Sequence, residues 1–295
     1  MPLIAVLSAL GASFCWAAGA LLAHKPATVL GPFALTRLQL VCAAAVLLVL
    51  VTAQNGWQSV VWAQWPAYVG ASAIGVVTAN MAMFACLRRG GPRRAQLLVS
   101  MNGPIAALLG FIFLGEILSA QKLLGCAIAL VGMALAIRFG GNAQDQLEDI
   151  RGSALTMIGL GLLAAAANAV GLILLKPAML EGTDPLAANA LRTAGGAIIV
   201  SAVALWRVPA LSSLTKPGNG LILHAITPGL LGFVVAVSLQ LYAVRWLDTG
   251  IAVVLGSAAP VIMLPMIWIV TGKRPRLLAW LGALLAMGGI ALIMI

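Results

Sequence analysis

The chain alternates between long apolar segments and short polar connections. Ten apolar segments follow one another, at about 3–23, 32–52, 66–87, 95–115, 119–138, 152–175, 186–206, 224–246, 250–271 and 277–295. About 20 apolar residues are enough for a helix to cross the roughly 30 Å hydrocarbon core of a bilayer. The segments lack the alternation that is typical of a membrane β-barrel. The pattern therefore predicts an all-α membrane protein with ten transmembrane helices.

The composition agrees with a membrane location. Hydrophobic residues make up 62% of the 295 residues and charged residues only 8%, and the mean hydropathy is +1.09. A soluble domain carries roughly 25% charged residues, so this chain could not cover its surface with polar groups. The net charge of +10 does not indicate nucleic-acid binding, because the basic residues lie in the connections between apolar segments. The four cysteines fall inside apolar segments and are interpreted as packing residues.

The basic residues are distributed unequally over the connections. Thirteen of the 17 Lys and Arg residues belong to the connections that follow odd-numbered segments, and four belong to the others. By the positive-inside rule, this asymmetry places the odd connections in the cytoplasm and both termini outside. The most polar connection, 140–151, holds three of the seven acidic residues. We expect it to be a linker between two halves.

The chain repeats itself at an offset of 157 residues. The matched pairs are Gly75/Gly232, Arg88/Arg245, Gly115/Gly272, Gly125/Gly282 and Gly132/Gly289, and Pro104 recurs at an offset of 156 as Pro260. The repeat predicts two five-helix copies, 1–139 and 152–295. Because each copy holds an odd number of spans, the two copies are expected to be inverted in the membrane. Transporters are often built from such repeats, with a site near the bilayer midplane between them.

Polar residues near the middle of the spans are the first candidates for that site. They are Asn80, Ser100, Asn102, Asn168, Gln240 and Ser257. A buried polar group is costly if it is unpaired, and an amide can bind either the ammonium or the carboxylate of a zwitterion. We expect these residues to surround a central cavity. The alternative is that each amide only bonds a neighbouring helix.

Aromatic and charged residues add further candidates. Trp16, Phe84 and Tyr242 could form apolar walls for a large side chain, or could be packing or lipid-facing residues. Arg37 and Arg192 lie near span ends, where anchoring at the membrane surface is favoured over binding of a substrate carboxylate. Glu116 ends the fourth span and is expected to cap it or to pair locally, for example with Lys122.

Pro104 and Pro260 lie near the middle of the fourth and ninth spans. A proline inside a helix removes one hydrogen bond and bends the helix. Paired bends in two inverted copies suit hinges that move between two states of a transporter, although static shape-fitting would explain them equally well. Gly125 and Ala129, and likewise Gly282 and Ala286, are small pairs four residues apart that predict close helix contacts, within the protein or at a dimer seam.

The motifs together resemble a known family. The resemblance covers essentially the whole chain and rests on the stretch Pro104 to Ala134, with Leu114-Gly115-Glu116 and Gln121, on its second copy from Pro260, and on the pairs Lys25-Pro26 and Lys176-Pro177. By these motifs the chain is similar to the EamA type of the drug/metabolite transporter superfamily. Within this type it is similar to bacterial aromatic amino-acid exporters. The second copy departs from the pattern, since Lys273 stands where the first has Glu116. Many members carry cytoplasmic termini, which conflicts with the charge count.

The resemblance implies export of amino acids, including aromatic and other apolar ones, or of similar small metabolites by alternating access across a bacterial inner membrane. The expected partners are this substrate and membrane lipids, not nucleic acid, and the protein is expected to be a monomer or weak dimer with no cofactor or metal. Since no Asp or Glu lies in mid-span, a facilitative carrier is favoured over proton coupling. A multidrug or sugar-type exporter remains the alternative. An intramembrane enzyme is disfavoured, because His24 and His224 both lie near span ends.

Overall fold

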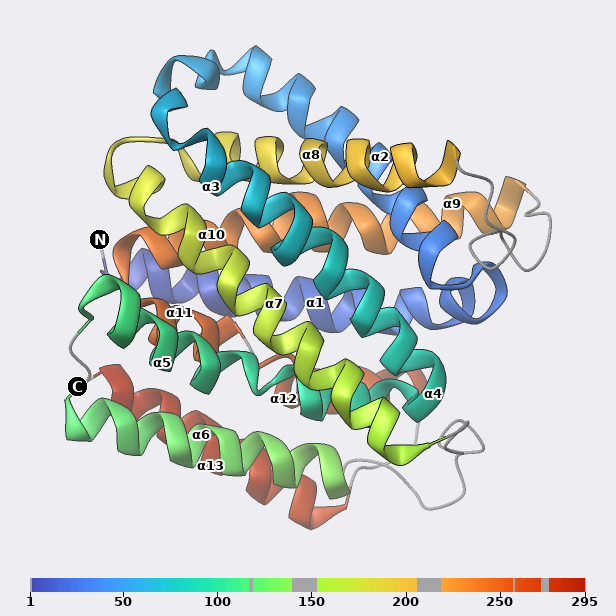
Figure 1. Ribbon diagram of the computed structural model, residues 1–295. Coiled ribbons are helices and arrows are strands. Elements are labelled where there is room, and N and C mark those ends of the chain that lie inside the picture. The colour runs from blue at the N-terminus through green and yellow to red at the C-terminus, as the bar shows by residue number, and fades with distance from the viewer. Residues whose placement is uncertain are drawn as a thin grey trace.

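The computed structural model describes residues 2–116, 119–139, 153–205, 219–256, 258–271 and 276–294. All secondary-structure elements in these ranges are helices (Figure 1). The elements of the first half are α1 (Pro2–Leu30), α2 (Pro32–Ala53), η1 (Gly56–Ser59), η2 (Trp62–Gln64), α3 (Trp65–Gly70), η3 (Ala71–Thr78), α4 (Ala79–Val99), α5 (Asn102–Leu114) and α6 (Ala120–Phe139). Those of the second half are α7 (Ala154–Leu180), α8 (Pro185–Leu205), α9 (Asn219–Gly229), η6 (Leu230–Ala236), α10 (Val237–Trp246), α11 (Thr249–Gly256), α12 (Ala259–Thr271) and α13 (Leu277–Met294). The all-α prediction is confirmed. The predicted linker 140–151 lies outside the described residues.

Six stretches of helix are long and apolar enough to cross a membrane. They are Leu3–Ala20, Pro32–Ala53, Trp62–Gly90, Ala154–Leu180, Pro185–Leu205 and Gly220–Trp246. Shorter apolar helices cover Asn102–Leu114, Leu123–Gly132 and Leu277–Gly289. Large apolar side chains such as Phe113, Ile198 and Ile269 are exposed on the outside, as a lipid-facing surface requires. The protein is therefore a multi-pass membrane protein, and the count of ten crossings stays a prediction.

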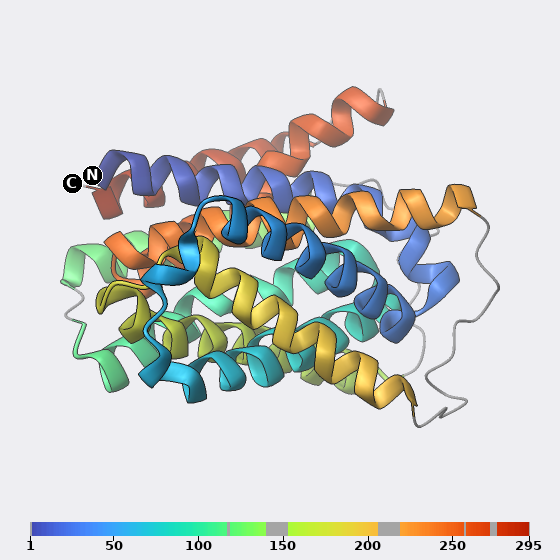
Figure 2. The ribbon, with the colours of Figure 1, turned by 90° about the horizontal axis from the view of Figure 1, so that it is seen from above.

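The two halves run in opposite directions. Both labelled ends of the chain lie at the same end of the molecule, called the terminal end below (Figures 1 and 2). The first helix of the first half, α1, starts at the terminal end, whereas the first helix of the second half, α7, finishes there (Figure 1). The chain direction therefore agrees with the inverted relation expected from the repeat.

Each half is completed by a helix of the other. Helix α1 packs mainly against α9, η6, α10, α11 and α12, while α7 packs mainly against η3, α4 and α5. The second helices of the halves, α2 and α8, pack against each other, and so do the last helices, α6 and α13. These pairings relate the halves by an approximate two-fold symmetry and place one interface through the middle of the molecule.

The last helices meet through the small residues that the sequence singled out. A side chain on Gly132 would overlap the backbone of Ala286 and Gly282, and one on Gly289 would overlap the backbone of Ala129 and Gly125. The contact is reciprocal, as the repeat requires. It shows that the small pairs hold the two halves of one chain together.

The predicted hinge prolines lie at helix starts, which corrects their placement in mid-helix. Pro104 is the third residue of α5 and Pro260 the second of α12. A proline is tolerated in a first helical turn because its missing N–H would have no partner there. The chain breaks just before each proline, at Ser100 and Met101 between α4 and α5, and around Ala258 between α11 and α12.

A second irregularity also occurs once in each half. η3 and η6 are π-helical segments, and η3 shifted by the repeat offset falls on 228–235, which overlaps η6. π-Helical turns are rare and are frequent at functional sites. The basic segment 88–94 was expected to be a loop, but it belongs to α4; arginine is a good helix former, which favours a helical turn there.

Candidate functional site

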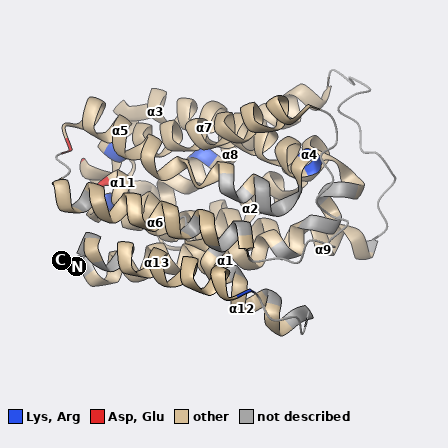
Figure 3. Ribbon diagram, turned by 90° about the horizontal axis from the view of Figure 1, so that it is seen from below, with Lys and Arg blue, Asp and Glu red and all other residues tan. Residues whose placement is uncertain are grey.

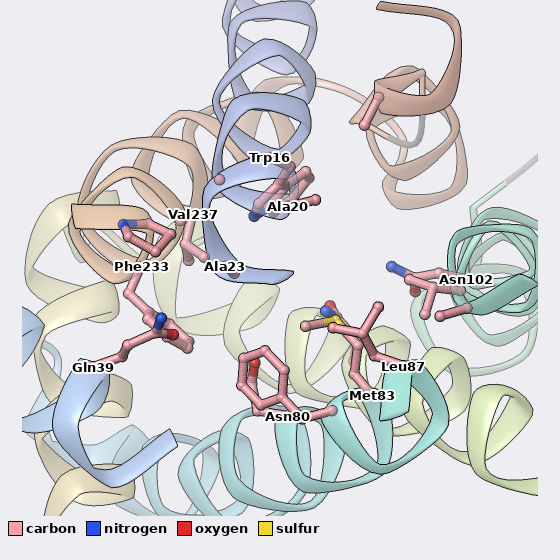
Figure 4. A pocket seen from close by; sticks show the side chains of 18 of the residues that line it. Trp16, Ala20, Ala23, Gln39, Asn80, Met83, Leu87, Asn102, Phe233 and Val237 are labelled. Carbon is pink, nitrogen blue, oxygen red and sulfur yellow. The ribbon is translucent and has the colours of Figure 1, made fainter. Parts of the chain in front are cut away.

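A cavity of about 180 Å³ lies between the two halves. Its lining comes from α1, α2, α4 and α5 of the first half and from α7, α8, α9, η6, α10, α11 and α12 of the second. Figure 4 shows Trp16, Asn80, Met83, Asn102, Phe233 and Val237 arranged around it. The cavity is thus surrounded by both copies of the repeat.

Six of the nine predicted substrate-binding residues line this cavity. They are Trp16, Asn80, Phe84, Ser100, Asn102 and Asn168. The amide nitrogen of Asn80 donates to the carbonyl of Val76, 2.7 Å away, one turn earlier and inside the π-helical segment η3. The structure brings these residues together from α1, α4, α5 and α7 and from the break between α4 and α5.

Two predicted residues lie elsewhere. Gln240 is 1% exposed and sits behind the wall: its amide nitrogen donates to the carbonyl of Ala252, and its side-chain oxygen lies against Gly256, which does line the cavity. Tyr242 is half-buried beside Trp246, with 6.5 Å between the ring centroids. Neither of them lines the cavity. Ser257 lies outside the described residues.

Two polar lining residues, Gln39 and Arg192, were not among the predicted site residues. Gln39 on α2 lines the cavity and donates its amide nitrogen to the carbonyl of Ala225, 2.9 Å away. Arg192 on α8 also lines it and is only 3% exposed, which corrects the expectation of an anchor at the membrane surface. Its Nε and Nη1 atoms have no hydrogen-bond partner among the described residues. A polar residue inside an apolar span was the signal that could have identified Gln39.

Both helix breaks reach the cavity. Val99, Ser100 and Asn102 line it at the break between α4 and α5, and Gly256 and Ala259 line it at the break between α11 and α12. Discontinuous helices at the middle of the membrane are a common way to form transporter sites. The side-chain oxygen of Asn102 is buried and has no hydrogen-bond partner within the described ranges, so the first break presents an available acceptor.

The remaining lining is largely apolar. Trp16, Phe84 and Phe233 supply aromatic surface, and Met83, Leu87 and Val237 supply aliphatic surface. A mostly apolar pocket with a few polar groups is the usual form of a small-molecule site, in which the polar groups fix the orientation of the ligand. The arrangement suits a molecule with an apolar part and a small polar head.

A buried polar network joins the halves at the terminal end (Figure 3). Gly115 ends α5 with a φ of 64°, a left-handed conformation that favours glycine, and the next residue, Glu116, turns inward. The Glu116 carboxylate accepts from the Lys176 Nζ at 2.5 Å, from the Thr249 hydroxyl at 2.6 Å and from the Thr249 N–H at 2.9 Å. Glu116 therefore pairs with Lys176 and caps α11. The side chain of Lys122, the local partner that the sequence suggested, lies outside the described residues.

A second set of contacts crosses between the halves at the same end. The Tyr68 hydroxyl lies 2.9 Å from the Thr183 hydroxyl, which also accepts from the N–H of Val61 at 3.0 Å. The amide nitrogen of Gln64 donates to the Glu181 carboxylate at 2.7 Å. These contacts tie the connection before α3 to the connection before α8, so the halves are closed against each other at the terminal end.

An all-helical membrane protein with two inverted, interlocked halves and a shared central cavity has the architecture of a transporter. The model of the EamA-like transporter family matches residues 3–138 and 155–295. The chain belongs to this family, whose members are transporters.

The fold is also found among solved structures. One, described as "Crystal structure of protein", has a TM-score of 0.77 and 19% sequence identity, and the similarity covers 98% of this chain and 95% of that chain. At this identity the likeness concerns the fold alone. No curated protein is significantly similar to the chain.

Proposed function

We propose that the protein exports amino acids, including aromatic and other apolar ones, or similar small metabolites across a bacterial inner membrane. The observation that carries the proposal is the central cavity, where aromatic walls from both halves face unpaired polar groups at mid-span. Asn80, Ser100, Asn102 and Asn168 would orient the polar head of the substrate. Trp16 and Phe84 would contact its apolar side chain.

The mechanism that we propose is alternating access. The halves are inverted copies, so the contacts that close the terminal end in this state have counterparts that would close the opposite end in the other state. The helix breaks before Pro104 and Pro260 and the π-helical segments η3 and η6 occur once per half. They are the positions at which we expect the helices to bend during the change.

The carrier is proposed to be facilitative. The buried carboxylate of the described residues, Glu116, is held by Lys176 and by Thr249. A carboxylate that is already neutralised by a lysine is a poor proton relay. Substrate would therefore move down its own gradient.

A counterflow assay tests the proposal. Proteoliposomes preloaded with unlabelled amino acid, without a proton gradient, should accumulate labelled amino acid transiently, while protein-free liposomes should not. A parallel panel of sugars and lipophilic cations addresses the multidrug or sugar-type alternative. Counterflow of these compounds but of no amino acid would contradict the proposed substrate, and strict dependence on an imposed proton gradient would contradict the facilitative mechanism.

A further inference from the structure

Arg192 is a buried cation, and no ion pair joins it to an acidic residue in the described part of the chain. It is 3% exposed, and two of its three guanidinium nitrogens have no hydrogen-bond partner among the described residues. Burial of an unpaired charge is strongly unfavourable, so such groups are normally paired or hydrogen-bonded. An arginine that lacks both and lines a cavity has its donors available for a ligand.

Three of the four acidic residues in the described part of the chain have partners other than Arg192. Glu116 binds Lys176, Glu181 accepts from Gln64, and the Asp184 carboxylate accepts from the N–H of Leu186. The polar neighbours of Arg192 on α8 are also satisfied: Asn189 donates to the carbonyl of Phe233 at 2.7 Å, and Thr193 donates to Asn189. Asn189 and Thr193 on α8 thus form hydrogen bonds with each other and with η6, and the Nε and Nη1 atoms of Arg192 take no part in them.

A complementary acceptor lines the same cavity. Asn102 has a buried side-chain oxygen without a partner, and Figure 4 shows Asn102 across the opening from Gln39 and Phe233. Phe233 is the residue whose carbonyl binds Asn189 on α8. The cavity lining thus includes cationic donors from the second half and a neutral acceptor from the first.

We infer that Arg192 binds the carboxylate of the transported substrate and that Asn102 accepts a hydrogen bond from its ammonium or another donor group. A guanidinium matches a carboxylate with two parallel hydrogen bonds. Arg192 is the single Lys or Arg among the described residues that line the cavity, so it neutralises one negative charge. A monoanionic carboxylate fits this charge, whereas a phosphate monoester would leave a second negative charge buried.

This inference rests on the proposed function and makes it more specific. The carrier would select for a free carboxylate and against the amide, the ester or a lipophilic cation of the same size. The selection would come from one residue, since the other polar groups of the cavity are neutral amides and hydroxyls.

The test compares substrate analogues in the counterflow assay. The wild-type protein should be inhibited by a free amino acid at a concentration about tenfold lower than by its carboxamide, because a charge-assisted hydrogen-bond pair is lost in the amide. In R192Q this ratio should fall to about one, and R192K should keep part of it. R37Q is the matched control: Arg37 lies on α2, is exposed and does not line the cavity, so its ratio should equal that of the wild type.

The outcomes separate the two ideas. Equal competition by amino acid and carboxamide in the wild type overturns the role of Arg192 and leaves amino-acid transport standing. Transport of carboxylates that lack an amine, without any transport of amino acids, supports Arg192 and contradicts the proposed substrate. Stronger competition by phosphate monoesters than by carboxylates overturns the carboxylate assignment. If R192Q does not fold, the wild-type ratio and the thermal stabilisation of the wild type by each analogue decide the question.

Discussion

Two basic residues in the described part of this protein are buried, and their surroundings differ. Lys176 is 7% exposed and has a carboxylate, Glu116, and a backbone carbonyl, Leu247, within hydrogen-bond distance. Arg192 has neither. The first arrangement holds the terminal end together, and the second is open to a ligand. The distinction separates a structural charge from a candidate binding charge.

Removal of Glu116 should destabilise the folded protein. In Glu116→Leu the Lys176 ammonium loses its counter-ion while it stays buried, and the free energy of unfolding should fall by about 3–5 kcal/mol. The measurement is thermal unfolding of the purified protein in detergent. The double variant Glu116→Leu with Lys176→Met removes both charges and should recover part of the loss. A single variant as stable as the wild type would show that the ion pair contributes nothing.

Mid-span polarity singled out four of the polar residues that line the cavity, but not its cation. Asn80, Asn102 and Asn168 stand out because amides are rare in long apolar segments. Arg192 is only six residues from the start of its predicted span, so distance along the chain suggested an exposed end. Packing of α8 against α2 and η3 buries it instead. The direction of Gln240 could not be obtained from spacing either, since it depends on the orientation of α10.

At the scale of helices, the repeat predicted which elements correspond but not where they break. The sequence placed two continuous spans around Pro104 and Pro260, whereas the structure has a helix break before each proline. A proline specifies that its own N–H is missing from the helix, and both a bend and a helix start satisfy this condition. In this protein each proline lies at a helix start, and the helix break before it contributes residues to the cavity lining.

The α6–α13 contact gives a prediction at the same scale. In Gly289→Ala the new methyl group would overlap the backbone of Ala129, and the free energy of unfolding should fall by about 1–3 kcal/mol. Gly288 is the matched control, because a methyl group there meets no atom within 4 Å. Gly288→Ala should therefore be as stable as the wild type or slightly more stable. Equal stability of both variants in thermal unfolding would mean that the helices do not meet at Gly289.

At the scale of the whole molecule, alternating access requires the terminal end to open. Gln64 of the first half and Glu181 of the second are joined there by a hydrogen bond. Glu181 is exposed. Cysteines at both positions, in a background without Cys15, Cys42, Cys86 and Cys126, can be joined by a short bifunctional thiol reagent. The crosslink should abolish counterflow, and release by a reductant should restore it if the reagent is cleavable.

Single-cysteine variants treated with the same reagent control for modification alone and should keep their activity. Undiminished transport in the crosslinked double variant would contradict an opening at this end. It would do so without affecting the assignment of the cavity, because the crosslink lies at the membrane surface and the cavity residues remain unchanged.

The exchange of first helices between the halves has a consequence for biosynthesis. Helix α1 is synthesised before most of its partners, which lie in α9 to α12 of the second half. The N-terminal half therefore enters the membrane with an unfilled seam next to α1 and an unfilled place for α7. The place for α7 can be filled as soon as α7 follows α6 into the membrane, but lipid or the insertion machinery must cover the seam next to α1 until α9 to α12 are made.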